Sequence, residues 1–210
     1  MAIPAERNNT YKRLAKLVGN TPLYEIKNIK IPNNCRIFCK EENMNPTGSH
    51  YDRFWVEFLK YYEENERTIN LNIPIVETST GNSGASFAWV CRALGFKNYH
   101  VVIPKDMPYS RRKQIESYGA KIHYSPENEY VGGLINEFQN YVHKLKKDLS
   151  SKNGHVKIQT PNHAKNGAHS IKSMENIAME IIEELSNVHK IQKVDYFVSA
   201  LGNGLTTKGM

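Results

Sequence analysis

The sequence predicts an α/β protein: two parallel-type, three-layer α/β domains, of which the C-terminal one is expected to be incomplete. Short apolar runs of strand length alternate with runs whose apolar residues recur at helical spacing. Loops rich in Gly, Ser, Thr and Asn follow several of the strands. Parallel strands need long crossover connections, which helices usually supply. The alternation therefore favours parallel sheets with helices packed on their faces.

The first part of the chain contains most of the predicted elements. Asn9 or Thr10 can cap a first helix that ends near Val18, and Gly19-Asn20-Thr21-Pro22-Leu23 breaks it. The elements expected next are a strand at 36–40, a helix from the loop at 45–52 to about 64, a strand at 73–77, a helix to 94, a strand at 99–103, a helix at 109–118 and a strand at 121–124.

The second part continues the alternation. The elements expected there are a helix from about Gly132 to Leu149, a short strand before Thr160, a helix at about Ser170–Leu185 and a strand at Val194–Ala200. A glycine loop follows the last strand, and Met210 is reached where a helix is expected to begin. A parallel strand is buried on both faces. We therefore expect a fragment or a truncated form, in which another chain or segment covers that strand.

Composition disfavours several kinds of partner. Lys and Arg number 28 against 21 Asp and Glu, a net charge of +7. These basic residues are dispersed, and the one cluster, at 144–147, fits a solvated helix face, so no nucleic-acid partner is expected. No apolar run approaches the roughly 18 residues of a membrane span. Residues 1–20 contain no signal-peptide core, so we expect a cytoplasmic protein without a membrane partner.

The cysteines do not indicate a metal site. Cys35, Cys39 and Cys91 form no CxxC pair and have no histidine at ligand spacing. We expect buried thiols at Cys39, on a strand, and at Cys91, on a helix, with Cys35 at the edge of a loop. No metal ligands are therefore predicted.

Three loops combine small polar residues with a following helix start: 45–52, 79–84 and 202–206. Ligands of open α/β sheets bind at the carboxyl ends of strands, where glycine allows close approach and helix N-termini stabilise negative charge. Together the loops predict a site for a ligand with phosphate and carboxylate groups. Each loop alone is also compatible with a plain turn. No dinucleotide fingerprint and no GxxxxGK[ST] motif occurs, which disfavours a nucleotide-binding domain.

Four motifs, in order along nearly the whole chain, resemble those of one enzyme family. They are Gly19–Leu23 (GNTPL), Lys40–Ser49 (KxExxNPTGS), Glu77–Gly84 (ExTSGNTG, with Ser79-Thr80 inverted) and Pro104–Arg112 with Tyr118-Gly119-Ala120 (PxxMxxxRR…YGA). The sequence is thus similar to the cysteine synthase and cystathionine β-synthase family, the β-family or fold type II of pyridoxal-phosphate enzymes. Chains of that family continue well beyond this point.

The resemblance implies pyridoxal 5′-phosphate as cofactor and a role for each matching residue. It assigns the substrate carboxylate to Ser79, Thr80 and Ser83, the cofactor's phenolic oxygen to Asn82, its phosphate to Gly202, Asn203, Gly204 and Thr206, and a substrate contact to Gln159. Hydroxyls and backbone N–H groups at a helix start suit such anions. Leu205 stands where the family has glycine.

Tyr51 occupies the position of the family's Schiff-base lysine. The family pattern ends NPTGSxKDR, whereas this sequence reads His50-Tyr51-Asp52-Arg53. A phenol cannot form a Schiff base, and with an ordinary pKa of about 10 it is a poor base. The cofactor, if bound, is therefore expected to be held non-covalently. His50 titrates in a useful range, but we expect it to be a surface residue at the helix start.

These observations predict a pyridoxal-phosphate-dependent lyase or transferase of the cysteine synthase type. It would catalyse β-replacement or β-elimination on a small amino acid, such as an O-activated serine, with activity impaired by Tyr51 and by the short chain. The alternative is a non-catalytic binding or regulatory protein with the same fold. The resemblance also implies a homodimer, a larger cofactor domain (1–43 with 158–210) and a smaller mobile substrate domain (44–157).

Overall fold

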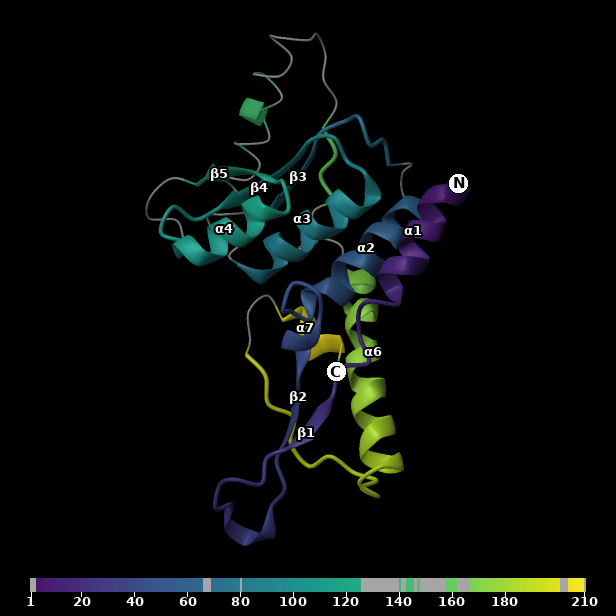
Figure 1. The fold of residues 1–210 in the computed structure, drawn as a ribbon, viewed down its shortest axis with the longest axis vertical. Coiled ribbons are helices and arrows are strands. Elements are labelled where there is room, and N and C mark those ends of the chain that lie inside the picture. Colours follow the sequence, from purple (N-terminus) through teal and green to yellow (C-terminus); the bar gives the residue numbers. More distant parts are fainter. Residues whose placement is uncertain are drawn as a thin grey trace.

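The computed structural model describes residues 3–65, 69–79, 81–125, 140, 143–145, 147, 158–161, 167–200 and 204–209. Its larger sheet consists of β3 (Ile75–Thr78), β4 (Tyr99–Ile103) and β5 (Lys121–Tyr124), side by side and all parallel (Figure 1). Helix α3 (Asn82–Leu94) connects β3 to β4, and α4 (Tyr109–Ser117) connects β4 to β5. Helices therefore make the crossovers that parallel strands need, and the α/β class is confirmed.

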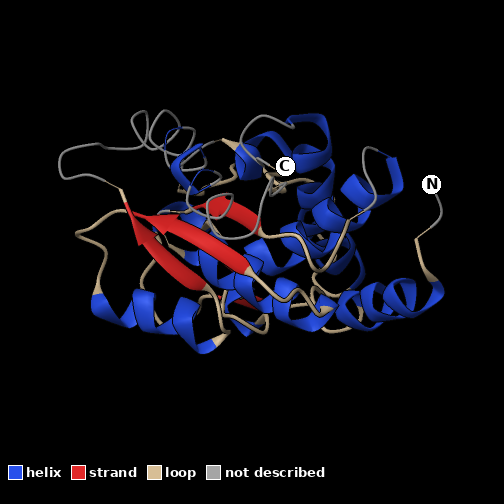
Figure 2. Ribbon diagram, turned by 90° about the horizontal axis from the view of Figure 1, so that it is seen from above, coloured by secondary structure: helices blue, strands red, loops and turns tan. Residues whose placement is uncertain are grey.

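The central strand of this sheet is buried on both faces. All five residues of β4 are buried, among them Val101, Val102 and Ile103, as is typical of a central parallel strand. Val101 and Ile103 belong to the main core, which side chains of α3 also line. Val102 instead packs with Val76 and Leu145 on the opposite face. Figure 2 shows the sheet with helices running along it.

Helix α2 (Tyr51–Asn65) supplies the aromatic part of the main core. Phe54, Trp55 and Phe58 recur at helical spacing, and all three are buried. The rings of Phe54 and Phe58 stack with centroids 5.0 Å apart, and Trp55 lies 4.8 Å from Phe87 of α3. Each buried side chain of this size contributes about 1.5–3 kcal/mol. The apolar stripe that predicts α2 therefore also fixes its place against α3.

A second region lies below the parallel sheet in Figure 1. Its elements are β1 (Leu23–Glu25), the 3-10 turn η1 (Pro32–Asn34), β2 (Phe38–Lys40), the 3-10 turn η2 (Glu42–Met44), α6 (Gly167–Asn187) and α7 (Leu205–Gly209). The strands β1 and β2 form an antiparallel pair, α7 packs on α6, and α6 also packs against α2. A Cβ atom at Gly209 would lie 2.5 Å from the Cβ of Met174, so glycine permits the close approach of α7.

The first helix, α1 (Ala5–Ala15), begins earlier than predicted. Pro4 takes the N-cap position, so the expected cap at Asn9 or Thr10 is wrong. Proline suits a helix start because its φ is already near the helical value and its missing N–H is not needed there. The helix lies against both α2 and α3.

Most other elements are confirmed to within a few residues. The strands β4 and β5 have the predicted bounds, and α2, α3 and α4 differ from prediction by a residue or so at either end. The short strand expected before Thr160 is a single parallel bridge between Ile75 and Gln159. The helix predicted at 132–149 lies largely outside the described residues.

The strand predicted at Val194–Ala200 is not formed. The segment has no regular secondary structure and a bend at Asp195, and Tyr196 and Val198 are each 89% exposed. A strand requires a neighbour that pairs its N–H and C=O groups. None of the described strands lies beside this segment. Its apolar pattern alone therefore does not make it a strand.

The prediction for Cys39 is also wrong. Cys39 and Cys35 are exposed, whereas Cys91 is buried as expected. Among the described strands, β2 pairs only with β1, and Cys39 lies on the exposed face of this pair. Within the described residues, no helix has the length and apolar character of a membrane span, and no three His, Cys, Asp or Glu residues are grouped as metal ligands.

Candidate functional site

The loop before α2 is fixed by its own short polar residues. Gly48 has φ of +82°, in the left-handed region that favours glycine. The Ser49 hydroxyl accepts a hydrogen bond from the Tyr51 N–H at 3.2 Å, as a helix cap does. The Asp52 carboxylate accepts bonds from the N–H and the hydroxyl of Thr47, at 2.6 and 2.5 Å. These bonds set where the first residues of α2 lie.

The start of α3 adjoins this loop. The hydroxyls of Thr47 and Ser86 lie 3.0 Å apart, and the Trp55 indole N–H donates to the Ser83 hydroxyl at 2.9 Å. Ser83 is buried. Its hydroxyl accepts from Trp55 and keeps its own hydrogen for a further bond. The structure thus brings together the first two of the three predicted loops.

Ser79 caps α3 with its side chain. Its hydroxyl accepts hydrogen bonds from the N–H groups of Gly81 and Gly84, at 3.0 and 2.7 Å, and donates to the Gly81 carbonyl at 3.1 Å. A Cβ atom at Gly84 would lie 3.0 Å from Ser79 Oγ, so glycine permits this close contact. The bonding capacity of Ser79 is therefore already used. Thr80 lies outside the described residues.

Asn82 is the first residue of α3 and is half-buried. Its carbonyl accepts a bond from the Ser86 hydroxyl at 3.2 Å. Its side-chain amide makes no hydrogen bond to any residue that the structure describes. Among the described residues of this loop, Asn82 and Ser83 thus have polar side-chain groups available to a ligand.

The start of α7 contacts the start of α2. Gly204 has φ of +81°, and its carbonyl accepts a bond from the Lys208 N–H at 3.0 Å. The hydroxyl of Thr206 lies 3.1 Å from Nε2 of His50. Gly202 and Asn203 lie outside the described residues. Described residues from all three predicted loops therefore lie together around the start of α2.

His50 is not the surface residue that the sequence suggested. It is half-buried, it contacts Thr206, and its ring lies 4.5 Å from that of Tyr51 between centroids. Burial lowers the pKa of His50, a shift that Glu42 opposes and Arg53 reinforces. The imidazole is therefore neutral at neutral pH and can both donate and accept hydrogen bonds. Its partner, 156 positions along the chain, explains why local reasoning missed it.

Tyr51 lies at the first position of α2, half-buried between His50 and the core. Its ring meets the Phe54 ring edge-on, with centroids 6.1 Å apart. Burial raises the pKa of the Tyr51 phenol, which is therefore protonated at neutral pH. A buried neutral phenol supplies neither the primary amine nor the base that a lysine would supply.

Gln159 is not brought together with the other predicted residues. Its side-chain amide accepts from the Asn70 N–H at 2.9 Å and donates to the carbonyls of Asn70 and Ile73, at 2.9 and 3.1 Å. These contacts lie at the amino end of β3, whereas Ser79 follows its carboxyl end. Gln159 here holds the turn that enters β3.

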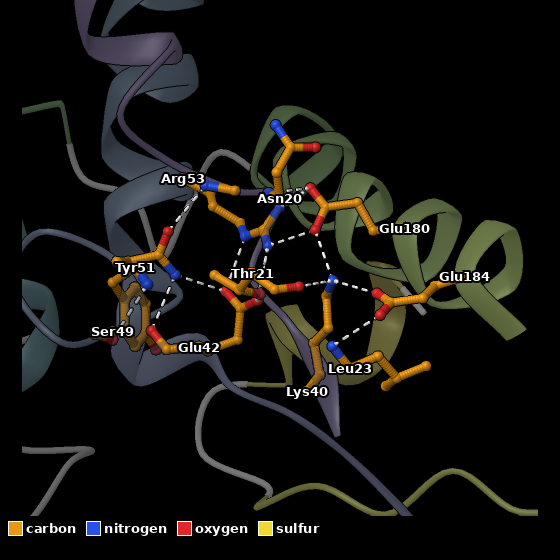
Figure 3. Close-up of polar contacts among 12 residues, drawn as sticks. Asn20, Thr21, Leu23, Lys40, Glu42, Ser49, Tyr51, Arg53, Glu180 and Glu184 are labelled. Atoms are coloured by element: carbon orange, nitrogen blue, oxygen red, sulfur yellow. Dashed lines mark hydrogen bonds and ion pairs between the residues drawn. The ribbon is translucent and has the colours of Figure 1, made fainter. Parts of the chain in front are cut away.

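A network of partly buried charges, which sequence reasoning missed, lies beside the start of α2 (Figure 3). The Arg53 guanidinium donates to both Glu42 and Glu180, with contacts of 2.8 Å to Oε2 of each. Its side chain is only 4% exposed. Burial alone would lower the pKa of Arg53, but the bonds to Glu180 and Glu42 raise it. Two bidentate carboxylates thus fix one planar side chain.

The network ties α6 to the loop before β1 and to β2. The Lys40 ammonium lies 2.9 Å from Glu180 and donates to the Thr21 carbonyl at 2.5 Å. Glu180 also accepts from the Asn20 N–H at 2.9 Å. Burial opposes ionisation of Glu180, yet Arg53, Asn20 and Lys40 lower its pKa to about 2. Lys40 is therefore committed to a carboxylate and a carbonyl, not free to replace the lysine missing at position 51.

These residues fit non-covalent binding of pyridoxal phosphate. The Thr206 hydroxyl, the Asn82 amide and the starts of α2 and α3 offer hydrogen-bond donors to an anionic, aromatic ligand. The φ of Gly204 gives the chain the tight turn that such a loop needs. The chemistry does not fit a covalent link at position 51, because the side chain there is a phenol.

Comparison with known proteins identifies the family of the chain. A family model described as pyridoxal-phosphate dependent enzyme matches residues 14–210. Cysteine synthase B of Campylobacter jejuni is 31% identical over 200 residues, which cover 95% of this chain and 60% of that protein. Cysteine synthase of Staphylococcus aureus (strain Mu50) is 27% identical over 94% of this chain and 58% of its own.

Solved structures give the same result. The crystal structure of a hydrogen sulfide-producing enzyme from Fusobacterium nucleatum matches with a TM-score of 0.75 and 32% identity, over 96% of this chain and 57% of that one. The chain thus spans about 60% of the length of the curated relatives it matches. With its four motifs, its parallel sheet and its converging helix starts, the chain belongs to the family of pyridoxal-phosphate dependent enzymes, in the fold type II branch of cysteine synthase and cystathionine β-synthase.

Proposed function

We propose that the protein binds pyridoxal phosphate non-covalently and acts on a small amino acid, such as an O-activated serine, as a lyase or transferase of the cysteine synthase type. We further propose that β-replacement or β-elimination is impaired in this chain. One observation carries the proposal: residues of all three predicted loops meet around α2, and its first residue is Tyr51.

Each part of the proposed site has a distinct task. Thr206 and Gly204, with Gly202 and Asn203, would bind the phosphate, and the Asn82 amide would bind the phenolic oxygen of the cofactor. Ser83, whose hydroxyl hydrogen is left by the Trp55 contact, would donate to the substrate carboxylate together with Thr80. The Ser79 hydroxyl would shape this loop by capping α3, since its own hydrogen bonds are already made. The bound cofactor would supply an electron sink. Gln159 is left out, because its amide holds the turn before β3.

Tyr51 limits what the proposed site can do. Its phenol cannot attach the cofactor, and because burial raises its pKa it is a weak base at neutral pH. Proton transfer at the substrate would therefore be slow. Binding of cofactor and amino acid would survive this change, because the groups proposed for binding lie elsewhere.

The second candidate is a binding or regulatory protein without turnover. The observation that favours it is also Tyr51, since nothing in the first turn of α2 replaces the amine. Both candidates predict cofactor binding. They differ in whether a product forms when an O-activated serine is added.

Absorbance spectroscopy tests the proposal. Added pyridoxal phosphate should give a bound spectrum that borohydride treatment does not fix to the protein. Tyr51→Lys should restore a borohydride-stable adduct at position 51, whereas the matched variant Tyr51→Phe should bind without one. A borohydride-stable adduct in the unmodified protein would overturn the non-covalent mode. Failure of every form to bind the cofactor would overturn the function.

We also propose the domain division, the homodimer and the cytoplasmic location expected from the sequence. The packing of α7 on α6 supports a unit formed by 1–43 and 158–210, although α1 itself lies against α2 and α3. Light scattering tests the dimer, and cell fractionation tests the location.

A further inference from the structure

His50 joins two loops of the proposed site and has no role so far. Its Nε2 atom lies 3.1 Å from the Thr206 hydroxyl, and its ring stands 4.5 Å from that of Tyr51. It is half-buried at the junction of α2 and α7. An imidazole held this way bridges the residue at the missing-lysine position and a residue proposed to bind phosphate.

The chemistry of this pair favours an anion. When Nε2–H donates to the Thr206 oxygen, the hydroxyl hydrogen is left to donate to a third group. Hydrogen bonds to a charged acceptor are about twice as strong as neutral ones. The charged groups near His50 are Glu42 and Arg53, which pair with each other, so neither neutralises a ligand at Thr206.

We propose that His50 is a positioning residue for the cofactor phosphate: it orients the Thr206 hydroxyl toward the phosphate and so replaces part of the anchoring that a covalent lysine would give. This inference rests on the proposed function. The proposed contact involves only the phosphate and not the pyridine ring. A ligand without a phosphate should therefore be indifferent to His50.

The binding of two aldehydes, one with and one without a phosphate, tests whether His50 acts through the phosphate. Pyridoxal phosphate and pyridoxal are titrated into the unmodified protein, His50→Phe and His50→Gln, with fluorescence as the readout. His50→Phe should weaken binding of pyridoxal phosphate about tenfold, the equivalent of one hydrogen bond to a charged group. It should leave pyridoxal binding unchanged. His50→Gln keeps an N–H donor and should recover part of the loss.

Two controls complete the experiment. His189→Gln changes a histidine that contacts Phe38 and Arg36, away from the site, and should bind both ligands normally. Adding Thr206→Val to His50→Phe should cost less than the sum of the two single changes, because the residues act as a pair.

The possible outcomes separate the proposed role of His50 from the proposed function on which it rests. If the unmodified protein binds no pyridoxal phosphate, both fail. If it binds but His50→Phe has no effect, or weakens both aldehydes equally, only the inference is overturned. Circular dichroism checks that each variant is folded, and His50→Gln carries the comparison if His50→Phe is not.

Discussion

At the scale of single residues, glycines and small polar side chains decide how closely the loops of the site approach the rest of the chain. Gly19 is the clearest case. Its φ is +81°, and an added Cβ would lie 2.7 Å from Arg53 Nη1 and 2.9 Å from Glu180 Oε1. Its N–H also donates to the Asn45 side chain at 2.9 Å. One residue therefore links the first loop motif to the charge network.

Gly19→Ala should destabilise the protein by about 2–3 kcal/mol. About 1 kcal/mol comes from the left-handed backbone, and the rest from displacing Arg53 or Glu180. Gly95→Ala is the matched control, because Gly95 has φ of +85° but its nearest neighbour, Leu71 Cδ1, lies 3.8 Å from the added atom. Urea unfolding measures both. Equal losses in the two variants would contradict a role for the contact with the network.

At the scale of elements, α2 organises the chain. Its apolar stripe packs on α3, its first turn meets the starts of α3 and α7, and Arg53 binds α6. A single helix thus positions the proposed site and joins the two regions. The carboxylate that completes this junction, Glu180, has a pKa of about 2.

Glu180→Gln should change how stability depends on pH. A carboxylate with a lowered folded pKa stabilises the protein above its unfolded pKa, and that stability is lost as pH falls toward the folded pKa. For Glu180 the window runs from 4.5 down to about 2. The pKa difference corresponds to at most about 3–4 kcal/mol, and solvent around this partly exposed side chain reduces the contribution.

Urea unfolding at pH 7, 4.5 and 2.5 measures this contribution. The unmodified protein should lose more stability over this range than Glu180→Gln, which starts less stable at pH 7. Glu183→Gln, on an exposed neighbour of the same helix, should follow the unmodified protein. Parallel pH profiles for Glu180→Gln and the unmodified protein would show that the network does not contribute.

At the scale of the whole molecule, the proposed site lies where the two regions meet, so a ligand there should stabilise both. A ligand that binds only the folded state at one hundred times its Kd adds about 2.7 kcal/mol. For a chain of this length, that raises Tm by roughly 5–10 °C.

Thermal unfolding with increasing pyridoxal phosphate checks this expectation. Tm should rise with ligand concentration and then follow its logarithm. Pyridoxal at equal concentration should raise Tm less, because it lacks the phosphate. A Tm that does not respond to pyridoxal phosphate would argue against a site at this junction.

The sequence by itself determined the α/β class, β4 and β5, α2 and the family. These features depend on the local spacing of apolar residues, on turn residues and on short motifs, all of which involve residues close together in the sequence. It also determined that position 51 carries a phenol instead of an amine, which limits the chemistry whatever the fold.

Only the tertiary structure decided which side chains meet. The bonds from His50 to Thr206 and from Arg53 to Glu180 span 156 and 127 positions, and no local pattern records such partners. The same reason explains the failures: Val194–Ala200 has a strand's pattern but no described strand beside it, and Cys39 lies on a strand with one described neighbour. Whether a residue is buried or a strand is paired depends on which other elements pack beside it, and only the folded chain determines this.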